Sequence, residues 1–347
     1  MTHELKKIIA NYLIAKNNGV KSVLATVVAL DGSSYRRPGV RMLIDENGKM
    51  TGAVSGGCVE KEILRQAKSV FETNMAKVMT YDGRFRLGCE GVLYILIEIF
   101  DPIPEFIDAF YNSTKERNDI SLCSYFSKKI ETSSQFGTTV KFNDVDEYSI
   151  SKEFNSENDT SSHLKFEQTM KPCFKLIIIG AEHDAVQLCT YASLTGWEVT
   201  IVAPISDSKT IENFPGAHEL INIEAADIEI NDIDSQTAIV LMTHSFVNDL
   251  KYLIALKDAK PIYLGLLGPS KRREKLLQAF LEHYPEVNDQ FFDVIHGPAG
   301  LNIGAETPQE IAISIVSEIL TITRKQDSRS LKNKSGNIHS HHSEVKW

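Results

Sequence analysis

The first third of the chain alternates helix-like spacing of apolar residues with short apolar runs. Apolar residues at positions 5, 8, 9, 12 and 13 share one helix face and predict an opening amphipathic helix. Asn47-Gly48, between the apolar stretches Arg41–Ile44 and Met50–Val54, predicts a β-hairpin. The remaining pattern predicts a strand at Ser22–Leu30, a helix at Cys58–Phe71, strands at Val78–Tyr81 and Val92–Phe100, a helix at Glu105–Arg117 and a strand at Ser121–Phe126. Residues 1–142 are therefore expected to form an α+β domain.

The second half has a different pattern. The apolar run Phe174–Ile179, the turn at Gly180, the helical stretch Asp184–Leu194 and the run Trp197–Val202 predict a βαβ unit. Further strands are expected at Ala238–Met242, Pro261–Leu267 and Phe292–Val294, and a last helix at Pro308–Thr323, capped by Thr307. Residues 173–326 are thus expected to form a Rossmann-like domain, a doubly wound parallel sheet. The polar segment 143–172 predicts a linker or irregular segment, and 327–347 a flexible tail.

Composition narrows the class of protein. With 347 residues, 42% of them hydrophobic and 24% charged, the chain is long enough for two globular domains. A net charge of -9 disfavours a nucleic-acid partner, because the phosphate backbone would repel it. No apolar run is long enough for a bilayer, so no membrane partner is expected. Five cysteines do not form a disulfide framework, and the start does not read as a signal sequence, so we expect a cytoplasmic protein with reduced thiols.

Two cysteines lie in glycine-rich turns, downstream of a basic loop. Thiolates are soft ligands for transition metals, and the planar arginine fork recognises phosphate. Together they predict a pocket for an anionic, metal-bearing cofactor. The candidate cofactor-binding residues are Arg36, Arg37, Arg41, Ser55, Gly56, Gly57, Cys58 and Cys89. The sequence leaves open that the cysteines only pack and that the arginines form a solvated charged loop.

A second candidate ligand site lies at the predicted carboxyl edge of the parallel sheet, at Gly180, His183 and His244. Glu182 stands where a dinucleotide fingerprint has its second glycine, and a glutamate there opposes a pyrophosphate. Ala203 follows the second strand, where an acidic residue would hold a ribose. We therefore expect no NAD(P) cofactor. His244 has an equally good alternative as a cap of the next helix.

These blocks together resemble the XdhC/CoxI family. The resemblance rests on Gly32–Gly39, Ser55–Glu60, Leu87–Cys89, Thr243-His244, Gly265–Gly268 with Lys271–Arg273, and Gly300–Ala312. The family comprises accessory and maturation factors for molybdenum hydroxylases such as xanthine dehydrogenase and carbon monoxide dehydrogenase. Its members bind the molybdenum cofactor (molybdopterin), protect it during sulfuration and deliver it to the apo-enzyme. They are chaperones rather than catalysts.

The resemblance implies a similar role for this chain. The arginine loop would bind the cofactor's phosphate, and Cys58 and Cys89 would contact molybdenum. The implied partners are a molybdenum hydroxylase apo-enzyme, a cofactor sulfurase and a second copy of the chain in a homodimer. Two alternatives stay open at this point: an NAD(P)-dependent oxidoreductase, and a protein-interaction module built on a Rossmann scaffold.

Overall fold

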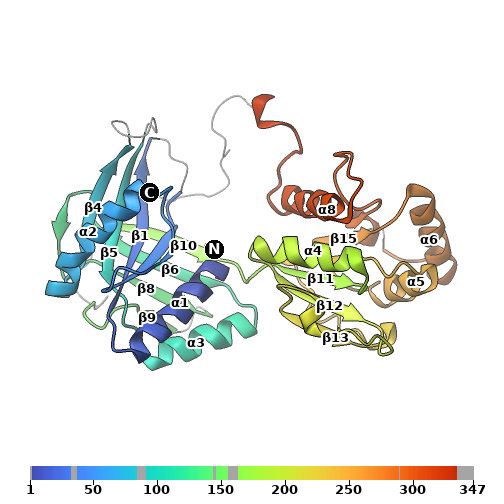
Figure 1. Cartoon of the computed structure of the whole chain (residues 1–347), viewed down its shortest axis with the longest axis horizontal. Helices are drawn as coiled ribbons and strands as arrows, with labels where there is room; N and C mark the ends of the chain where they lie inside the picture. The colour runs from blue at the N-terminus through green and yellow to red at the C-terminus, as the bar shows by residue number, and fades with distance from the viewer. Residues whose placement is uncertain are drawn as a thin grey trace. The chain divides into compact units, whose positions relative to one another are not determined.

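The computed structural model describes residues 2–32, 37–83, 91–143, 146–154, 163–288 and 290–333, apart from the side chain of Cys58. The chain divides into two units, with the boundary between Pro172 and Cys173. The coloured ribbon follows the chain through both units (Figure 1).

In the described residues of the N-terminal unit, two antiparallel sheets and three helices follow one another in the order in which α1 to β10 are labelled (Figure 1). The elements are α1 (Thr2–Asn17), β1 (Ser22–Asp31), β2 (Arg41–Asp45), β3 (Met50–Gly52), α2 (Cys58–Thr73), β4 (Lys77–Asp82), β5 (Val92–Ile99), α3 (Pro104–Lys115), β6 (Ile120–Phe126), β7 (Glu131–Thr132), β8 (Gly137–Phe142), β9 (Asp146–Ser149) and β10 (Leu164–Met170). One sheet has the order β3-β2-β1-β5-β4-β7, and the other β10-β6-β8-β9. The expected hairpin is confirmed, since Asn47-Gly48 joins β2 to β3 and Ile44 pairs with Met50.

The first sheet of this unit is covered on both faces. Strand β1 is buried over nearly its whole length, which explains its continuous apolar run. On one face α2 packs through Val59, Ile63 and Ala67. The opposite face meets the second sheet, and α1 and α3 close the same core through side chains such as Ile8 and Phe106. The α+β prediction for the N-terminal domain is confirmed.

The segment 143–172 differs from the expected linker, because it contains β9 and β10. Strand β10 pairs with β6 from Leu164 opposite Phe126 to Met170 opposite Ile120. Only Phe166 and Met170 are buried in β10, so a single apolar side chain every few residues anchors it. The segment belongs to the N-terminal unit, and its polar outer face is why composition alone indicated a linker.

The C-terminal unit is a doubly wound parallel sheet, as predicted. Its elements are β11 (Lys175–Ile179), α4 (His183–Leu194), β12 (Glu198–Ala203), the 3₁₀ turns η2 (Ile211–Asn213) and η3 (Ala225–Asp227), β13 (Glu219–Asn222), β14 (Thr237–Leu241), α5 (Phe246–Ala255), β15 (Tyr263–Leu266), α6 (Ser270–His283), α7 (Gln290–Asp293), β16 (Ile295–His296), α8 (Pro308–Thr323) and η4 (Leu331–Asn333). The strand order is β13-β12-β11-β14-β15-β16, and every pairing is parallel.

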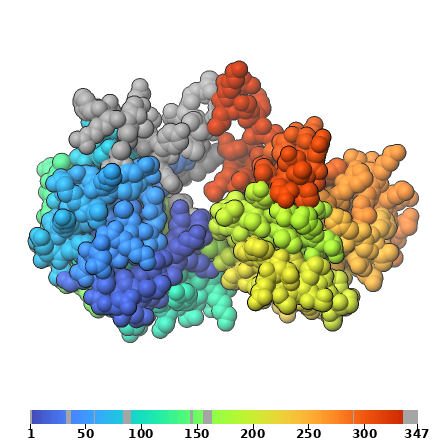
Figure 2. Space-filling model, in the orientation of Figure 1, coloured from blue at the N-terminus to red at the C-terminus, as the bar shows by residue number. Residues whose placement is uncertain are grey.

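Helices cover both faces of this sheet. Leu176 and Ile178 face α4 and α8, whereas Ile177 and Ile179 face the side of α5 and α6, as the period of a strand requires. The side chains of α4 and α8 meet in the space-filling view (Figure 2). The expected strand at Phe292–Val294 is wrong by a few residues, since α7 and then β16 take its place.

The last helix begins as its sequence predicts. The hydroxyl of Thr307 accepts a hydrogen bond from Glu310 N at 3.3 Å, and the Glu310 carboxylate accepts one from Thr307 N at 3.0 Å. This reciprocal capping satisfies backbone donors at the start of α8. Among the described residues, no helix has the length and apolar character needed to cross a membrane.

Candidate functional site

A single carboxylate holds the turn that precedes α2. Glu60 Oε1 accepts hydrogen bonds from Val54 N, at 3.0 Å, and from Ser55 N. Glu60 Oε2 accepts from the Ser55 hydroxyl and from Gly57 N, both at 2.8 Å. Three backbone donors and one hydroxyl thus converge on one side chain, which belongs to a residue only 6% exposed. The turn Ser55–Cys58 is fixed from its inner side.

Glu60 stays ionised in this position. Burial would raise the pKa of Glu60, but the hydrogen bonds from Ser55 and Gly57 outweigh burial and lower it. The first turn of α2 also favours a negative charge. Gly57 has no side chain to return the bond, so the capping box is half formed. This role of Glu60 was not predicted from the sequence. The available signal was its spacing: Glu60 lies three residues after Gly57, as in a capping box.

No described atom covers the outer side of the same turn at Gly56 and Gly57. Gly57 is the N-cap residue that precedes α2, and its φ of 123° lies in the region that favours glycine. A Cβ built on Gly56 or Gly57 would meet no described atom within 4 Å. These glycines are therefore not explained by close packing, and they leave the backbone accessible to a ligand at the start of a helix.

The predicted cofactor-binding residues fall into different environments. Arg37 is exposed, and Cys58 is the first residue of α2. Arg36, Cys89 and the thiol of Cys58 lie outside the described part of the chain. Their convergence on one pocket stays a prediction.

Arg41 departs from the expected anion loop. It lies in β2 and is 6% exposed, with Nη1 donating to Gly39 O at 2.9 Å and to Gln168 Oε1 at 2.7 Å. Its Nε and Nη2 atoms have no hydrogen-bond partner within the described structure. Burial lowers the pKa of Arg41 to about 10, against the opposing charge of Glu98. The side chain ties β2 to β10 across the core rather than extending the exposed surface at Arg37.

The second candidate site lies where the strand order of the parallel sheet changes direction, between β11 and β14. Gly180 ends β11 with φ of 137°, and a Cβ there would lie 2.3 Å from Met242 O. Only glycine fits this close approach of the two strand ends. Ligands of open α/β sheets bind in the crevice at this edge.

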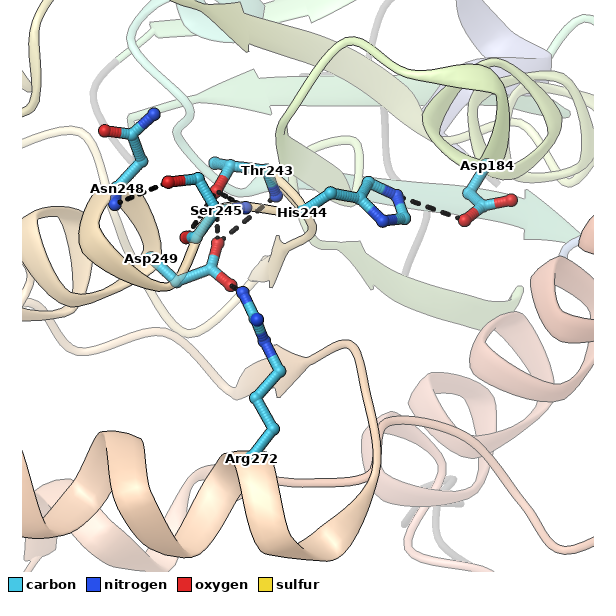
Figure 3. A network of polar contacts seen from close by, with 7 residues as sticks. All are labelled: Asp184, Thr243, His244, Ser245, Asn248, Asp249 and Arg272. Carbon is cyan, nitrogen blue, oxygen red and sulfur yellow. Dashed lines mark hydrogen bonds and ion pairs between the residues drawn. The ribbon is translucent and has the colours of Figure 1, made fainter.

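An imidazole and a carboxylate face one another at this edge of the sheet (Figure 3). His244 follows β14 with φ of 56°, and its Nε2 lies 3.2 Å from Asp184 Oδ2 in the first turn of α4. The His244 side chain is 47% exposed, so a solute can reach it. His183, the first residue of α4, is at least partly exposed as well. The structure thus brings His244 to the start of α4, where His183 also lies.

The N-terminus of α4 carries negative charge. Glu182 is its N-cap residue, and its carboxylate is 61% exposed and lies 3.7 Å from Lys209 Nζ. Asp184 follows in the first turn. A dinucleotide pyrophosphate would have to lie against these two carboxylates, which repel it.

An ion pair between the buried Asp249 and the partly exposed Arg272 supports the loop that carries His244 (Figure 3). Asp249 Oδ1 accepts from the Thr243 hydroxyl at 2.6 Å, and Asp249 Oδ2 accepts from Arg272 Nη2 at 2.6 Å. The Asp249 side chain is 4% exposed. Ser245 begins α5 by accepting from Asn248 N at 3.4 Å. The positive charge of Arg272 is therefore neutralised internally, and no local pattern in the sequence signals this pairing across 23 residues.

Side chains that could ligate a metal ion are dispersed in both units. No three His, Cys, Asp or Glu side chains are grouped to hold an ion among the residues that the structure describes. Cys173 and Cys189 are buried, and Cys123 is half-buried in β6. These three cysteines pack within their own units.

The fold and these sites define a two-domain protein. An α+β domain with an accessible glycine turn comes first. A Rossmann domain follows, with carboxylates at the start of α4, where a dinucleotide would place its pyrophosphate. The chain belongs to the XdhC/CoxI family. The model of the XdhC and CoxI family matches residues 15–82, and the model of the XdhC Rossmann domain matches residues 176–319. The family resemblance proposed from the sequence is confirmed.

Three similar proteins illustrate this membership. A protein of Bacillus subtilis, named as a probable subunit of xanthine dehydrogenase, is 28% identical over 88% of this chain and 94% of its own. The molybdenum cofactor insertion chaperone PaoD of Escherichia coli is 24% identical, over 95% and 92%. A crystal structure described as a xanthine dehydrogenase from Bacillus halodurans shares the fold with a TM-score of 0.74 and 24% identity, over 93% and 97% of the two chains. The family and the insertion chaperone PaoD support a role in the maturation of molybdenum hydroxylases.

Proposed function

We propose that this protein binds molybdenum cofactor and delivers it to a molybdenum hydroxylase apo-enzyme, such as a xanthine dehydrogenase. The observation that carries the proposal is the open glycine turn at the start of α2, fixed by Glu60, in a chain related along its length to an insertion chaperone. A turn that is already fixed before the ligand arrives lowers the cost of binding it. Handover follows when the client binds the cofactor more tightly than the carrier does.

The residues of the N-terminal unit fit such a ligand. The backbone at Gly56 and Gly57 has room for close approach, and the exposed Arg37 offers a planar fork to a phosphate. Arg36 is assigned the same role, and the thiols of Cys58 and Cys89 the contact with molybdenum. Arg41 supports this surface from the core. The cofactor supplies its redox chemistry to the client, while the residues of this chain hold and shield it.

The Rossmann unit is assigned to covering the cofactor or docking the client. The carboxylates of Glu182 and Asp184 support the proposal that NAD(P) is not its ligand. A homodimer, an encounter with a cofactor sulfurase and a cytoplasmic location belong to the same proposal.

Transfer of the cofactor tests this function. The protein is loaded with isolated molybdenum cofactor, freed of excess ligand and mixed with apo-xanthine dehydrogenase, and recovered activity is measured. We expect the loaded protein to restore activity faster than the same amount of free cofactor. An equal rate would contradict the delivery role, and oxidation of NAD(P)H with a substrate would favour the oxidoreductase alternative.

The binding turn is tested separately through its cysteines. We expect Cys58→Ala to lower cofactor retention by roughly tenfold or more, as loss of a group that supports a bound metal does. Cys123→Ala is the matched control, since that half-buried thiol lies in β6 of the same unit. Retention equal to wild type in both Cys58→Ala and Cys89→Ala would remove the thiols from the proposed site.

A further inference from the structure

A small cavity enters the N-terminal unit at the C-terminal end of α2, where that helix meets the end of β5. Its volume is about 170 Å³. Glu98, Phe136 and Phe154 are buried residues of its lining, whereas Asn74 and Glu153 are exposed and mark its mouth together with Ser134. An apolar protein cavity of about 150 Å³ holds a benzene molecule, so this one has room for a small organic ligand.

Glu98 is one of the residues that line this cavity, and no cation contacts its carboxylate within the described structure. The residue is 1% exposed, and both of its carboxylate oxygens accept from Thr138, Oε2 from the backbone N–H at 2.8 Å and Oε1 from the hydroxyl at 2.6 Å. Within the described structure, no Lys, Arg or His nitrogen forms an ion pair with it. Each carboxylate oxygen retains capacity for a further donor. A buried charge without a contacting partner is costly, which a cationic ligand would relieve.

The surroundings reinforce the preference for a cation. Helix α2 ends at Asn74 with no basic residue in its last turn, so the negative end of its dipole lies at the mouth. Glu153 adds a second carboxylate there, and no Lys or Arg occurs in the lining that the structure describes. The phenyl rings of Phe136 and Phe154 supply apolar surface, and aromatic faces attract organic cations.

We propose that this cavity is a binding site for a small organic cation, an ammonium or amidinium compound with an apolar body, recognised by Glu98. The site is unsuited to a phosphate-bearing pterin, because its carboxylates would repel the anion. It is therefore independent of the proposed cofactor site. Burial raises the pKa of Glu98 to about 7, against its hydrogen bonds from Thr138 and the longer-range charge of Arg41 on β2. Binding of a cation accordingly strengthens as the pH rises through this value.

Calorimetric titration of the full-length protein tests the site with two ligands of equal size, benzylammonium and benzyl alcohol. We expect saturable binding of one benzylammonium and at least tenfold weaker binding of the neutral alcohol. The variant Glu98→Gln should lose at least tenfold in affinity for benzylammonium, whereas Glu105→Gln, an exposed carboxylate of α3, should bind as wild type.

A second variant blocks the mouth of the cavity and leaves Glu98 unchanged. Ser134→Trp adds bulk at the rim and should abolish binding while circular dichroism stays unchanged. Equal affinity for the ammonium and the alcohol would overturn the proposal. Wild-type affinity in Ser134→Trp, or in a folded Glu98→Gln, would overturn it as well.

Discussion

Replacing Glu60 by glutamine tests whether one carboxylate fixes the proposed cofactor-binding turn. The glutamine amide keeps one acceptor oxygen in place of two. That oxygen can still accept from Val54 and Ser55, but the NH₂ group then faces Gly57 N, another donor. The substitution therefore leaves at least one backbone donor unpaired while keeping the volume of the side chain.

The magnitude follows from the number and charge of these bonds. A hydrogen bond to a charged group contributes about 1.5–3 kcal/mol, and an unpaired buried donor costs about 1–3 kcal/mol. We expect Glu60→Gln to lower the free energy of unfolding of the N-terminal unit by about 3 kcal/mol. At the size of this unit the melting temperature falls by roughly 6–12 °C.

The pH dependence has a defined sign. Because the pKa of Glu60 is lowered in the folded protein, its contribution is fully present above the unfolded value of about 4.3. That contribution is lost as the pH falls through the folded pKa. The stability gap between wild type and Glu60→Gln is therefore largest near neutral pH and shrinks in acid.

Urea unfolding followed by circular dichroism measures this gap at neutral pH and at several acidic values. Glu72→Gln is the matched control, because Glu72 is an exposed residue near the other end of α2. Cofactor retention should fall together with stability in Glu60→Gln alone. If Glu60→Gln is as stable as Glu72→Gln, the Glu60 carboxylate does not fix the turn. The same holds if the stability difference between wild type and Glu60→Gln does not change with pH.

Three further substitutions test other parts of the structure. Gly180→Ala places a Cβ 2.3 Å from Met242 O at a φ of 137°, so thermal unfolding should show a loss of about 2–4 kcal/mol, and an unchanged melting temperature would contradict the close approach. Asp249→Asn removes the charge that pairs with the partly exposed Arg272 and should cost about 1.5–3 kcal/mol in urea unfolding, part of which the double variant with Arg272→Met should recover. The pKa of Glu98 is raised to about 7 in the folded state, so the wild-type protein loses stability as the pH rises from about 4.5 to 7. Over that range, the stability of Glu98→Gln should increase by about 3 kcal/mol relative to wild type. Parallel pH profiles of stability for the two proteins would contradict this.

The sequence predicted the fold where burial is continuous or strictly periodic. Strand β11 is apolar from Leu176 to Ile179 because helices cover both of its faces, and α8 carries its own capping signal. Strand β10 has no such pattern, because it buries only Phe166 and Met170 and is otherwise polar. A strand stabilised mainly by backbone pairing to β6 leaves little trace in composition.

The sites were less predictable because their contacts join distant positions. The sequence places Arg41 next to a basic loop, but Gln168, which lies 127 residues further on, accepts its hydrogen bond in the core. Residue type and local pattern carry no information on such a contact. Glu60 was closer to detection, since its spacing from Gly57 follows a local capping rule, although the additional bonds from Val54 and Ser55 were not foreseeable.

The molybdenum and pterin content of the purified protein directly measures whether it binds molybdenum cofactor. The protein is purified from cells that synthesise molybdenum cofactor, and metal is quantified by mass spectrometry alongside fluorescence of the oxidised pterin. We expect molybdenum and pterin in equal amounts, near one of each per chain. Protein purified from such cells without molybdenum and without pterin would contradict the proposed cofactor binding.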